Sequence, residues 1–542
     1  MGEHKKTIRV RVFRRVPGVI DEGRYEDYEV ETYPKMKALG ALDYINERYR
    51  ANIAYRRSCR DGNCGSCTLL VDGVASVACK ADVADGTVLE PLPGYPLIRD
   101  LVVDRSRELS RFREEKIWRM GKEVGGFARI TPDQLVNFKK LTICVDCAAC
   151  NVMCPVLEKA GFVGPMYMTY VARMASNPLD EGDRVAQAYD EGLYSCILCG
   201  FCKEVCPKNI DMVNHGIIKM REASAERGLM PEALKTIRGN ILDHGDPLGI
   251  NPEEKTLWAR ELDFSQDKST VFFASTYPIM GYIENILTVN EYLRDADMDF
   301  DAMAKISGKI SKSNARYRET LAHMVKILRD LGVNVGYLYE EEPSCGHELY
   351  LYGFVNDFTQ YANEVFKLLR EAGVKEIIAP DPHVVYAFKE LYPRVVKGFD
   401  IAVRTLVEVL YETLRGKNLR LSIREGVKVA YHDPCYLARY LGIIEQPRKI
   451  LSRIDGVEVF EPKSKGLSTR CCGFISTYPG LTRDVTAERL KDLVGTGAEK
   501  ILTACPVCMA QLRVGAKALK HDVEVLDIAD LVHEVLLGGG QG

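Results

Sequence analysis

The sequence predicts a multidomain protein that combines α+β and α/β parts. Its cysteines fall into three blocks, at 59–79, 144–206 and 435–508, with Cys345 alone between the last two. The pattern of apolar residues changes along the chain, from short alternating runs to helical periods and then to alternating strands and helices. At roughly 150 residues per domain, a chain of this length is enough for about three or four units. We expect the domains 1–107, 108–235, 236–418 and 419–542.

The N-terminal segment is expected to form a small sheet crossed by one helix. Short alternating runs predict strands at 7–13, 27–33, 67–73 and 87–92, and positions 36–47 have a helical pattern. A charged amphipathic helix is expected at 108–120, where it links this unit to the next. Residues 131–225 are expected to be mostly helical, with 165–176 as one helix.

The C-terminal part contains an internal repeat. The segment 345–385, which begins "CGHELYLYGF", is similar to 472–509, which begins "CGFISTYPGL". Each copy is followed by an apolar helix, at 399–410 and at 526–536. Alternating strands and helices predict an α/β fold. We therefore expect a pseudo-twofold α/β domain made of two copies of one unit.

The composition restricts the function and the compartment. The formal net charge is −3 and charged residues make up 27% of the chain without a long run of one sign, so nothing indicates nucleic-acid binding. No apolar h-region follows the strand-like start "MGEHKKTIRVRVFRRV", so we expect no signal peptide. No run of residues approaches the roughly 18 apolar residues of a membrane-spanning helix. We expect a cytoplasmic protein without a transmembrane segment. In that reducing compartment, 18 cysteines indicate metal or redox chemistry.

The first cysteine block has the spacing of a two-iron cluster. Cys59, Cys64 and Cys67 form C-x4-C-x2-C, and Cys79 follows as the fourth cysteine. This is the plant-type ferredoxin pattern, and it predicts a [2Fe-2S] cluster in a β-grasp ferredoxin domain. A zinc knuckle is the alternative, but zinc sites favour paired C-x2-4-C units.

The second block indicates two four-iron clusters in an α-helical ferredoxin domain. Two runs, 144–155 and 196–207, both read C-x2-C-x2-C-x3-C-P. In two-cluster ferredoxins the fourth cysteine of each run binds the other cluster. We therefore assign one [4Fe-4S] cubane to Cys144, Cys147, Cys150 and Cys206, and the second to Cys196, Cys199, Cys202 and Cys154.

These two blocks resemble the iron-sulfur subunits of succinate dehydrogenase and fumarate reductase. The similarity is carried by "RRSCRDGNCGSCTLLVDG", "PLIRDLVVD" and the doubled cysteine run. That family usually has a non-cysteine residue at the position of Cys199, which leaves a three-iron cluster. Because this chain has a cysteine there, we expect a complete four-iron cubane. The family's quinone pocket has tryptophans where Val156 and Leu157 stand here. We do not expect a quinone site at this position.

The third block offers five cysteines from three separated segments, namely Cys435, Cys471, Cys472, Cys505 and Cys508. One cubane uses four thiolates, so a fifth indicates a spare nucleophile or an unusual cluster. "DPCYLARYLG", "RCCGF" and "ACPVC" resemble the CCG domain of the heterodisulfide reductase B subunit. That resemblance implies that the five cysteines hold a non-cubane [4Fe-4S] cluster with a catalytic role. A zinc site and a vicinal disulfide are the alternatives.

The first copy of the repeat lacks this cysteine set. Aligning the copies places Tyr277 opposite Cys435, and Ser344 and Cys345 opposite the adjacent pair. Asp381 and Val384 stand opposite the final pair. We expect this half to be chiefly structural. Cys345, Asp381 and His383 could meet as a metal site, although ordinary buried or surface roles are favoured.

Together the blocks resemble the B-subunit family of thiol:fumarate reductases. The resemblance implies that coenzyme M and coenzyme B thiols are oxidised to the heterodisulfide at the CCG cluster. Electrons would then pass through the [4Fe-4S] and [2Fe-2S] clusters to a partner that reduces fumarate to succinate. No G-x-G-x-x-G motif follows a strand in this chain, so FAD is expected only on the partner subunit.

Two other functions remain open at this point. The chain could be an electron-transfer subunit of a succinate, 2-hydroxy-acid or glycerol-phosphate flavin dehydrogenase that uses a quinone or a ferredoxin-like carrier. It could also be a scaffold with zinc in some of the sites.

Overall fold

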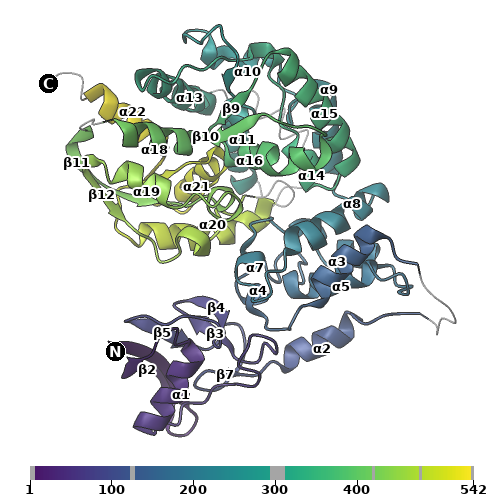
Figure 1. The fold of residues 1–542 in the computed structure, drawn as a ribbon, viewed down its shortest axis with the longest axis vertical. Coiled ribbons are helices and arrows are strands. Elements are labelled where there is room, and N and C mark those ends of the chain that lie inside the picture. The colour runs from purple at the N-terminus through teal and green to yellow at the C-terminus, as the bar shows by residue number, and fades with distance from the viewer. Residues whose placement is uncertain (1–5, 122–128, 293–311, 418–420, 475–478, 539–542) are drawn as a thin grey trace. The chain divides into compact units, whose positions relative to one another are not determined.

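The computed structural model describes residues 6–121, 129–292, 312–417, 421–474 and 479–538. The chain divides into two compact units, Met1–Met220 and Arg221–Gly542, and each is described by itself. Both contain helices and sheets, as the predicted mixed fold class requires (Figure 1). Among the described residues, no helix is both long enough and apolar enough to cross a membrane.

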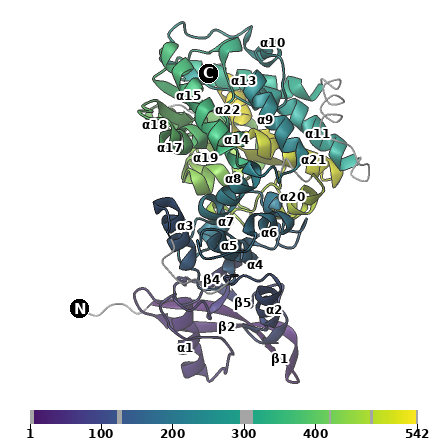
Figure 2. The ribbon, with the colours of Figure 1, turned by 90° about the vertical axis from the view of Figure 1, so that its right-hand side faces the viewer.

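The N-terminal unit begins with a five-stranded mixed sheet in the order β2-β1-β5-β3-β4. Its strands are β1 (Lys6–Val16), β2 (Ile20–Thr32), β3 (Thr68–Val71), β4 (Val74–Val77) and β5 (Thr87–Glu90). Only the pairing of β1 with β5 is parallel among these described strands. The apolar side of α1 (Ala38–Tyr49) lies against the sheet (Figure 2). The predicted strands and the predicted helix are all present.

The helical part of this unit follows a short hairpin of β6 (Leu97–Arg99) and β7 (Val102–Val103). The helix predicted at 108–120 is shorter and earlier, α2 (Ser106–Glu114), and Lys116 just beyond it has a φ of 47°, which no right-handed helix contains. The helices that follow are α3 (Pro132–Thr142), α4 (Ala149–Val152), α5 (Pro165–Ala175), α6 (Arg184–Asp190), η1 (Leu193–Ser195), α7 (Phe201–Glu204) and η2 (Val213–Ile217). The next helix, α8 (Ile218–Glu226), begins in this unit and ends in the second.

The C-terminal unit contains two parallel sheets. The first has the order β10-β9-β8, from β8 (Thr270–Phe272), β9 (Glu376–Ala379) and β10 (Ala402–Thr405). The second has the order β12-β11-β13-β14, from β11 (Leu421–Tyr431), β12 (Ile454–Phe460), β13 (Lys500–Thr503) and β14 (Glu524–Asp527). A single parallel bridge between Val271 and Gly336 takes the place in the first sheet that β12 has in the second.

The two copies of the repeat have the same order of elements. In each copy the first strand leads into a short helix, η4 (Tyr277–Ile279) or η7 (Tyr436–Tyr440). The next matched strands lead into α16 (Pro382–Tyr386) and α21 (Pro506–Ala518), and the last into α18 (Leu406–Gly416) and α22 (Ile528–Gly538). Because the carboxyl ends of parallel strands meet at one edge of a sheet, the residues after these strands are brought together.

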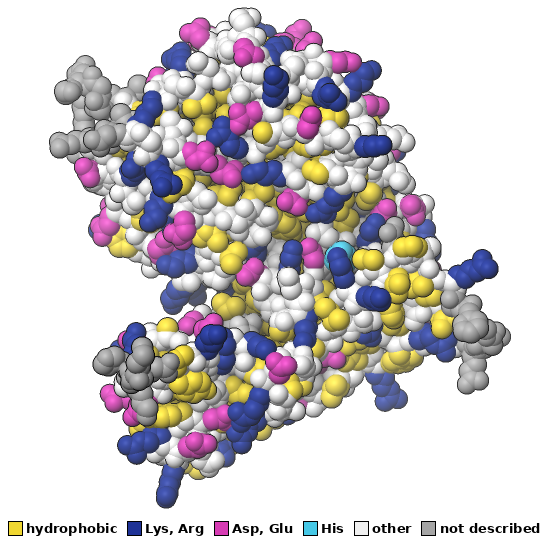
Figure 3. Space-filling model, viewed as in Figure 1, with side chains coloured by type: hydrophobic (Ala, Val, Ile, Leu, Met, Phe, Trp, Pro, Cys, Tyr) yellow, Lys and Arg dark blue, Asp and Glu magenta, His cyan; other side chains and the backbone are white. Residues whose placement is uncertain are grey.

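The C-terminal unit also contains other helices (Figure 1). They are α9 (Glu232–His244), α10 (Pro252–Lys255), η3 (Leu257–Ala259), α11 (Met280–Tyr292), α13 (Lys312–Asp330), η5 (Tyr339–Glu341), α14 (His347–Leu351), α15 (Val355–Glu371), η6 (Ala387–Leu391), α17 (Tyr392–Val395), α19 (Glu445–Leu451), η8 (Gly466–Ser468) and α20 (Pro479–Val494). On the face drawn in Figure 3, acidic and basic side chains are interspersed and neither sign forms a continuous field.

Asp100 connects β1 to the segment that precedes the first cysteine block. Its fully buried carboxylate accepts hydrogen bonds from Arg14 Nε (3.1 Å), the Arg15 amide (3.1 Å) and the Ala54 amide (2.9 Å). We expect Asp100→Ala to lower the free energy of unfolding by about 3 kcal/mol, since breaking a buried ion pair is costly and Arg14 keeps Glu26 as a second partner.

Chemical denaturation followed by circular dichroism measures this loss. The control is Asp82→Ala, which removes an exposed ion pair with Lys37 and should cost at most about 1 kcal/mol. Equal effects of the two substitutions would contradict the role assigned to Asp100.

Candidate iron-sulfur sites

The first site is a loop that donates backbone hydrogen bonds to its own sulfurs. Cys59, Cys64 and Cys67 precede β3, and Cys79 follows β4. The Gly62 amide donates to Cys79 Sγ (3.1 Å), and the amides of Asn63 and Asp61 donate to Cys59 Sγ (3.2 and 3.4 Å). Such donors favour the thiolate form that iron requires.

The four thiols of this loop have different electrostatic surroundings. Hydrogen bonds from the Ser66 side chain and from nearby backbone lower the pKa of the exposed Cys64 to about 6. Burial raises the pKa of Cys67, which contacts Cys79, to about 11. The exposed pair, Cys59 and Cys64, and the buried pair, Cys67 and Cys79, are therefore the outer and inner sides of one site.

The two runs of the second block have the same backbone conformation. Asp146 and Leu198 have φ values of 51° and 52°, and Ala148 and Gly200 have φ values of 61° and 74°. Each pair of left-handed residues turns the chain before a single helical turn, α4 or α7. The similarity of the two sequences thus extends to their local structure.

The structure brings the eight cysteines of this block into two groups. One cavity is lined by Cys144, Cys147, Cys150 and Cys206, and a second by Cys154, Cys196, Cys199 and Cys202. Cys202 also lines the first cavity. In each group the fourth cysteine of one run joins three of the other, which is the exchange that the sequence predicts.

Burial opposes ionisation of these thiols. It raises the pKa of Cys150, Cys154 and Cys202 well above the ordinary value for a thiol, and neighbouring cysteines add to this effect. Thiolates are stable in such surroundings only beside a cation, which iron would supply. The eight thiols fit two iron-sulfur clusters, and each cavity has the four sulfur donors that a cubane needs.

The first and second cysteine blocks are packed against each other at Gly65. A Cβ atom at this position would lie 2.3 Å from the Val145 carbonyl oxygen and 2.9 Å from Cys147 Cα. Gly65 also has a φ of 65°, which favours glycine. The backbone of the two-iron loop therefore touches the loop that carries Cys144 and Cys147, a short path for an electron.

The third site joins three segments of the second repeat. Cys435 is the N-cap of η7, Cys471 and Cys472 lie in the loop after η8, and Cys505 is the N-cap of α21, with Cys508 in its first turn. Contacts run between the thiols in the order Cys435, Cys471, Cys472, Cys508 and Cys505. All five predicted cysteines are therefore neighbours, and each is a free thiol.

The thiols of the third site differ in the direction in which their pKa values are shifted. Hydrogen bonds from Cys471 and Cys508 lower the pKa of the buried Cys472 to about 5. The Cys471 contact and burial raise the pKa of Cys435. For Cys505, burial raises the pKa, but hydrogen bonds from Cys508 and His383 outweigh burial and lower it to about 6. Thiols with lowered pKa values, Cys472 and Cys505, thus alternate with thiols whose pKa values are raised, Cys435 and Cys508, in one group of five sulfurs that could bind several irons.

Side chains on neighbouring elements hold the loop with the adjacent cysteines. Thr486 donates a hydrogen bond to the Cys472 carbonyl (2.8 Å), and Arg439 donates to the carbonyls of Leu467 and Thr469 (3.0 and 2.7 Å). Asp433 is buried, accepts two bonds from Arg448 (2.8 Å each) and accepts the Gly466 amide (2.8 Å). Gly473 has a φ of 97°, so only glycine follows the pair without strain.

Two residues of the first repeat reach the third site. Asp381 is the N-cap of α16 and pairs with His383 Nδ1 at 2.7 Å, and the same nitrogen lies 4.0 Å from Cys505 Sγ. Interaction with Asp381 and Cys505 outweighs burial and raises the pKa of His383. Among the described residues, Cys345 does not join Asp381 and His383 in a group of possible metal ligands, in line with the ordinary role favoured for it; Cys505 is the sulfur that meets the other two.

The first repeat itself has no set of converging cysteines. Its single cysteine, Cys345, is buried and its carbonyl accepts the Tyr392 hydroxyl (3.1 Å). The structure also shifts the predicted alignment by one residue. Thr276, rather than Tyr277, corresponds to Cys435, because each caps the short helix after its strand and a tyrosine follows each. Local sequence similarity in this stretch is too weak to set the register.

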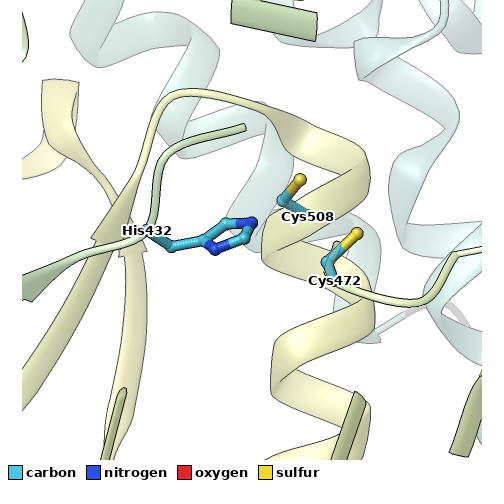
Figure 4. Close-up of side chains that lie close together, drawn as sticks. All are labelled: His432, Cys472 and Cys508. Atoms are coloured by element: carbon cyan, nitrogen blue, oxygen red, sulfur yellow. The ribbon is translucent and has the colours of Figure 1, made fainter. Parts of the chain in front are cut away.

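His432 is a neighbour of the third site that the sequence analysis missed. One of its ring nitrogens and the sulfurs of Cys472 and Cys508 lie within 4.8 Å of one another (Figure 4). Burial and the guanidinium of Arg489 lower the pKa of His432 well below its ordinary value, so the ring is neutral. In the sequence, its position three residues before Cys435 could have indicated that it lies near the site.

Comparisons with known proteins agree with this division of sites. The chain matches family models for a 2Fe-2S iron-sulfur cluster binding domain over 9–110, a 4Fe-4S dicluster domain over 140–210, and a cysteine-rich domain, CCG, over 310–388 and 429–513. A similar curated protein is the B subunit of fumarate reductase (CoM/CoB) from Methanothermobacter marburgensis, 30% identical over 97% of this chain and 98% of that protein.

One further relative covers a part of the chain, and one solved structure has a similar fold. The fumarate reductase iron-sulfur subunit of Escherichia coli O6:H1 is 33% identical over 38% of this chain and 88% of that protein. The crystal structure of a hypothetical protein from Helicobacter pylori has a TM-score of 0.59 at 14% identity, covering 100% of this chain and 97% of that chain. The second similarity is one of fold alone.

Gly65→Ala tests the contact between the first two cysteine blocks. We expect it to destabilise the N-terminal unit by more than Gly73→Ala, since Gly73 has a similar φ of 76° but open space around it. The control should cost about 1–2 kcal/mol from the left-handed backbone alone. Thermal unfolding of the unloaded chain measures both losses, and equal losses would contradict direct contact of the two loops.

Proposed function

The chain belongs to the family of the fumarate reductase (CoM/CoB) B subunits, and we propose that it is the iron-sulfur subunit of a thiol:fumarate reductase. It is an oxidoreductase subunit with iron-sulfur and CCG domains. The observation that carries the finer proposal is the unbroken series of contacts among the five thiols of the third site.

The proposed reaction is balanced in electrons and protons. Coenzyme M and coenzyme B are thiols, and each gives up its proton and one electron as the disulfide bond between them forms. The two electrons pass along the iron-sulfur centres to FAD on a flavoprotein partner. There they add with two protons across the double bond of fumarate and yield succinate.

The proposed cofactors follow the cysteine groups. A [2Fe-2S] cluster is assigned to Cys59, Cys64, Cys67 and Cys79, and two [4Fe-4S] cubanes to the two groups of the second block. A non-cubane [4Fe-4S] cluster is assigned to Cys435, Cys471, Cys472, Cys505 and Cys508. When bound, that cluster would supply iron that takes a substrate sulfur and accepts its electrons.

The finer fold assignments are part of the same proposal. We assign a β-grasp ferredoxin domain to 1–107 and a helical two-cluster ferredoxin domain to 108–235. A linker with the first CCG copy occupies 236–418, and the second copy occupies 419–542. The shared order of strands and helices in the two copies supports a pseudo-twofold origin.

The chain's own residues shape the reaction site in three ways. Hydrogen bonds from Thr486 and Arg439 hold the loop that carries Cys471 and Cys472. These bonds fix the two adjacent thiols against α21. The rings of His383 and Tyr436 have centroids 4.1 Å apart and form one side of the site, beside Cys505. The Asp381 pair keeps the His383 ring in one orientation.

The thiol assignment is tested on the purified complex with fumarate and both thiols. Cys472→Ala should abolish succinate formation from the thiols while leaving fumarate reduction by an artificial reductant in place. Cys345→Ala, a buried cysteine outside the sites, should keep both activities. Lack of thiol-dependent succinate in the wild-type complex, with the artificial reductant still effective, would eliminate the thiol assignment.

Cys199 should make the second cubane complete. The wild-type chain is expected to show only four-iron signals from this block, and Cys199→Ala is expected to show the electron paramagnetic resonance (EPR) signal of an oxidised three-iron cluster. Cys345→Ala is again the control. A three-iron signal of equal size in the wild-type protein prepared without oxygen would show that Cys199 is not a ligand.

A further inference from the structure

His432 lies at the end of β11 and points into the third site. Its side chain is buried, and one ring nitrogen is close to the sulfurs of Cys472 and Cys508. Figure 4 shows the ring with its outer nitrogen, Nε2, toward Cys508. A histidine in this position can act in two ways toward iron-sulfur chemistry. It can bind iron through a lone pair, or it can donate an N–H to sulfur.

Arg489 decides between these two possibilities. Its Nε donates a hydrogen bond to His432 Nδ1 at 2.9 Å. A guanidinium has no acceptor, so Nδ1 must offer its lone pair in this contact. The neutral ring therefore carries its proton on Nε2. Since that nitrogen is an N–H donor, it has no lone pair for iron.

Arg489 is itself fixed and does not turn to release the ring. Its side chain is fully buried, and its Nη1 donates to the Ser464 carbonyl (2.8 Å) and to Asp492 Oδ2 (2.9 Å). The loop after β12, which carries Ser464, and the helix α20, which carries Asp492, thus determine where the guanidinium lies. The orientation and the tautomer of His432 follow from that position.

The N–H on His432 Nε2 has no acceptor among the residues that the structure describes. A buried donor left without a partner destabilises the folded protein. Such a cost in a well-packed site indicates an acceptor that the polypeptide does not supply. The sulfurs of Cys472 and Cys508 lie close to this ring, so a sulfur of a bound cluster would be a suitable acceptor.

The first repeat supports the same conclusion independently. The His432 amide donates to the Leu502 carbonyl, and the equivalent bond in the first repeat runs from the Phe273 amide to the Ile378 carbonyl. Phe273 therefore occupies the position of His432 and is completely buried. The repeat that lacks the cysteine set also has a side chain that cannot donate a hydrogen bond.

We propose that His432 donates a hydrogen bond through Nε2–H to a sulfur of the cluster held by the third cysteine block, and that Arg489 is the positioning residue that fixes this tautomer. The inference rests on the proposed function, because it needs a cluster at this site. A hydrogen bond to sulfur stabilises the more negative, reduced cluster and raises its reduction potential. A higher potential favours electron transfer from thiols to the cluster.

The test compares the reduction potentials of His432→Phe and His432→Gln with that of the wild-type complex, by redox titration followed by EPR spectroscopy. Phe reproduces the first repeat and removes the donor, so the potential of the third-site cluster should become more negative with iron and sulfide unchanged. Gln keeps an N–H donor near the same point, so the potential should return toward the wild-type value. The other clusters should not shift.

Three outcomes would overturn the inference. An unchanged potential in His432→Phe would show that no hydrogen bond is made. Loss of iron from both variants would indicate a ligand, as would strong nitrogen coupling in pulsed EPR of wild-type protein with 15N-labelled histidine. Weak nitrogen coupling together with an exchangeable proton is expected instead, and this measurement needs no variant.

Failure of the inference and failure of the proposed function are separable. Wild-type protein that holds no cluster at the third site would contradict both. A cluster present in the wild-type protein, with the potential insensitive to His432→Phe, would contradict only the role of His432.

Discussion

The structure depends on one constraint, which is that sulfur anions in a protein interior need compensating positive charge or N–H donors. Burial raises the pKa of the thiols in the second block, and neighbouring cysteines raise it further. The first block meets the constraint with backbone amides directed at Cys59 and Cys79. In the second block bound iron would supply the positive charge, and in the third block the side chain of His383 also lowers the pKa of Cys505.

The duplicated C-terminal unit shows how one fold can carry the chemistry in one copy and assist it from the other. Both copies place the ends of parallel strands at one edge, where a capping residue begins a helix. In the second copy that residue is Cys505, and in the first it is Asp381, which orients His383 beside Cys505. The first copy, which its sequence predicted to be chiefly structural, therefore also contributes a polar pair to the site.

Local patterns made most of the fold and of the cysteine groups predictable. The strands of the first sheet follow from alternation: in β1 the buried Ile8, Val10 and Val12 alternate with the exposed Arg9 and Arg11. The exchange of Cys154 and Cys206 between cavities follows from the spacing of the two runs. The early end of α2 was not predictable, because nothing in the sequence marks Lys116 as left-handed. The roles of His432 and His383 depend on Arg489 and Asp381, and only packing reveals these contacts.

Mössbauer spectroscopy of anaerobically prepared, 57Fe-enriched protein with parallel iron analysis tests the central claim most directly. One two-iron and three four-iron clusters predict about 14 irons per chain, with a spectral component that belongs neither to a two-iron cluster nor to a cubane. About 10 irons per chain, as expected for one two-iron cluster and two cubanes alone, and spectra of those types only would contradict the account.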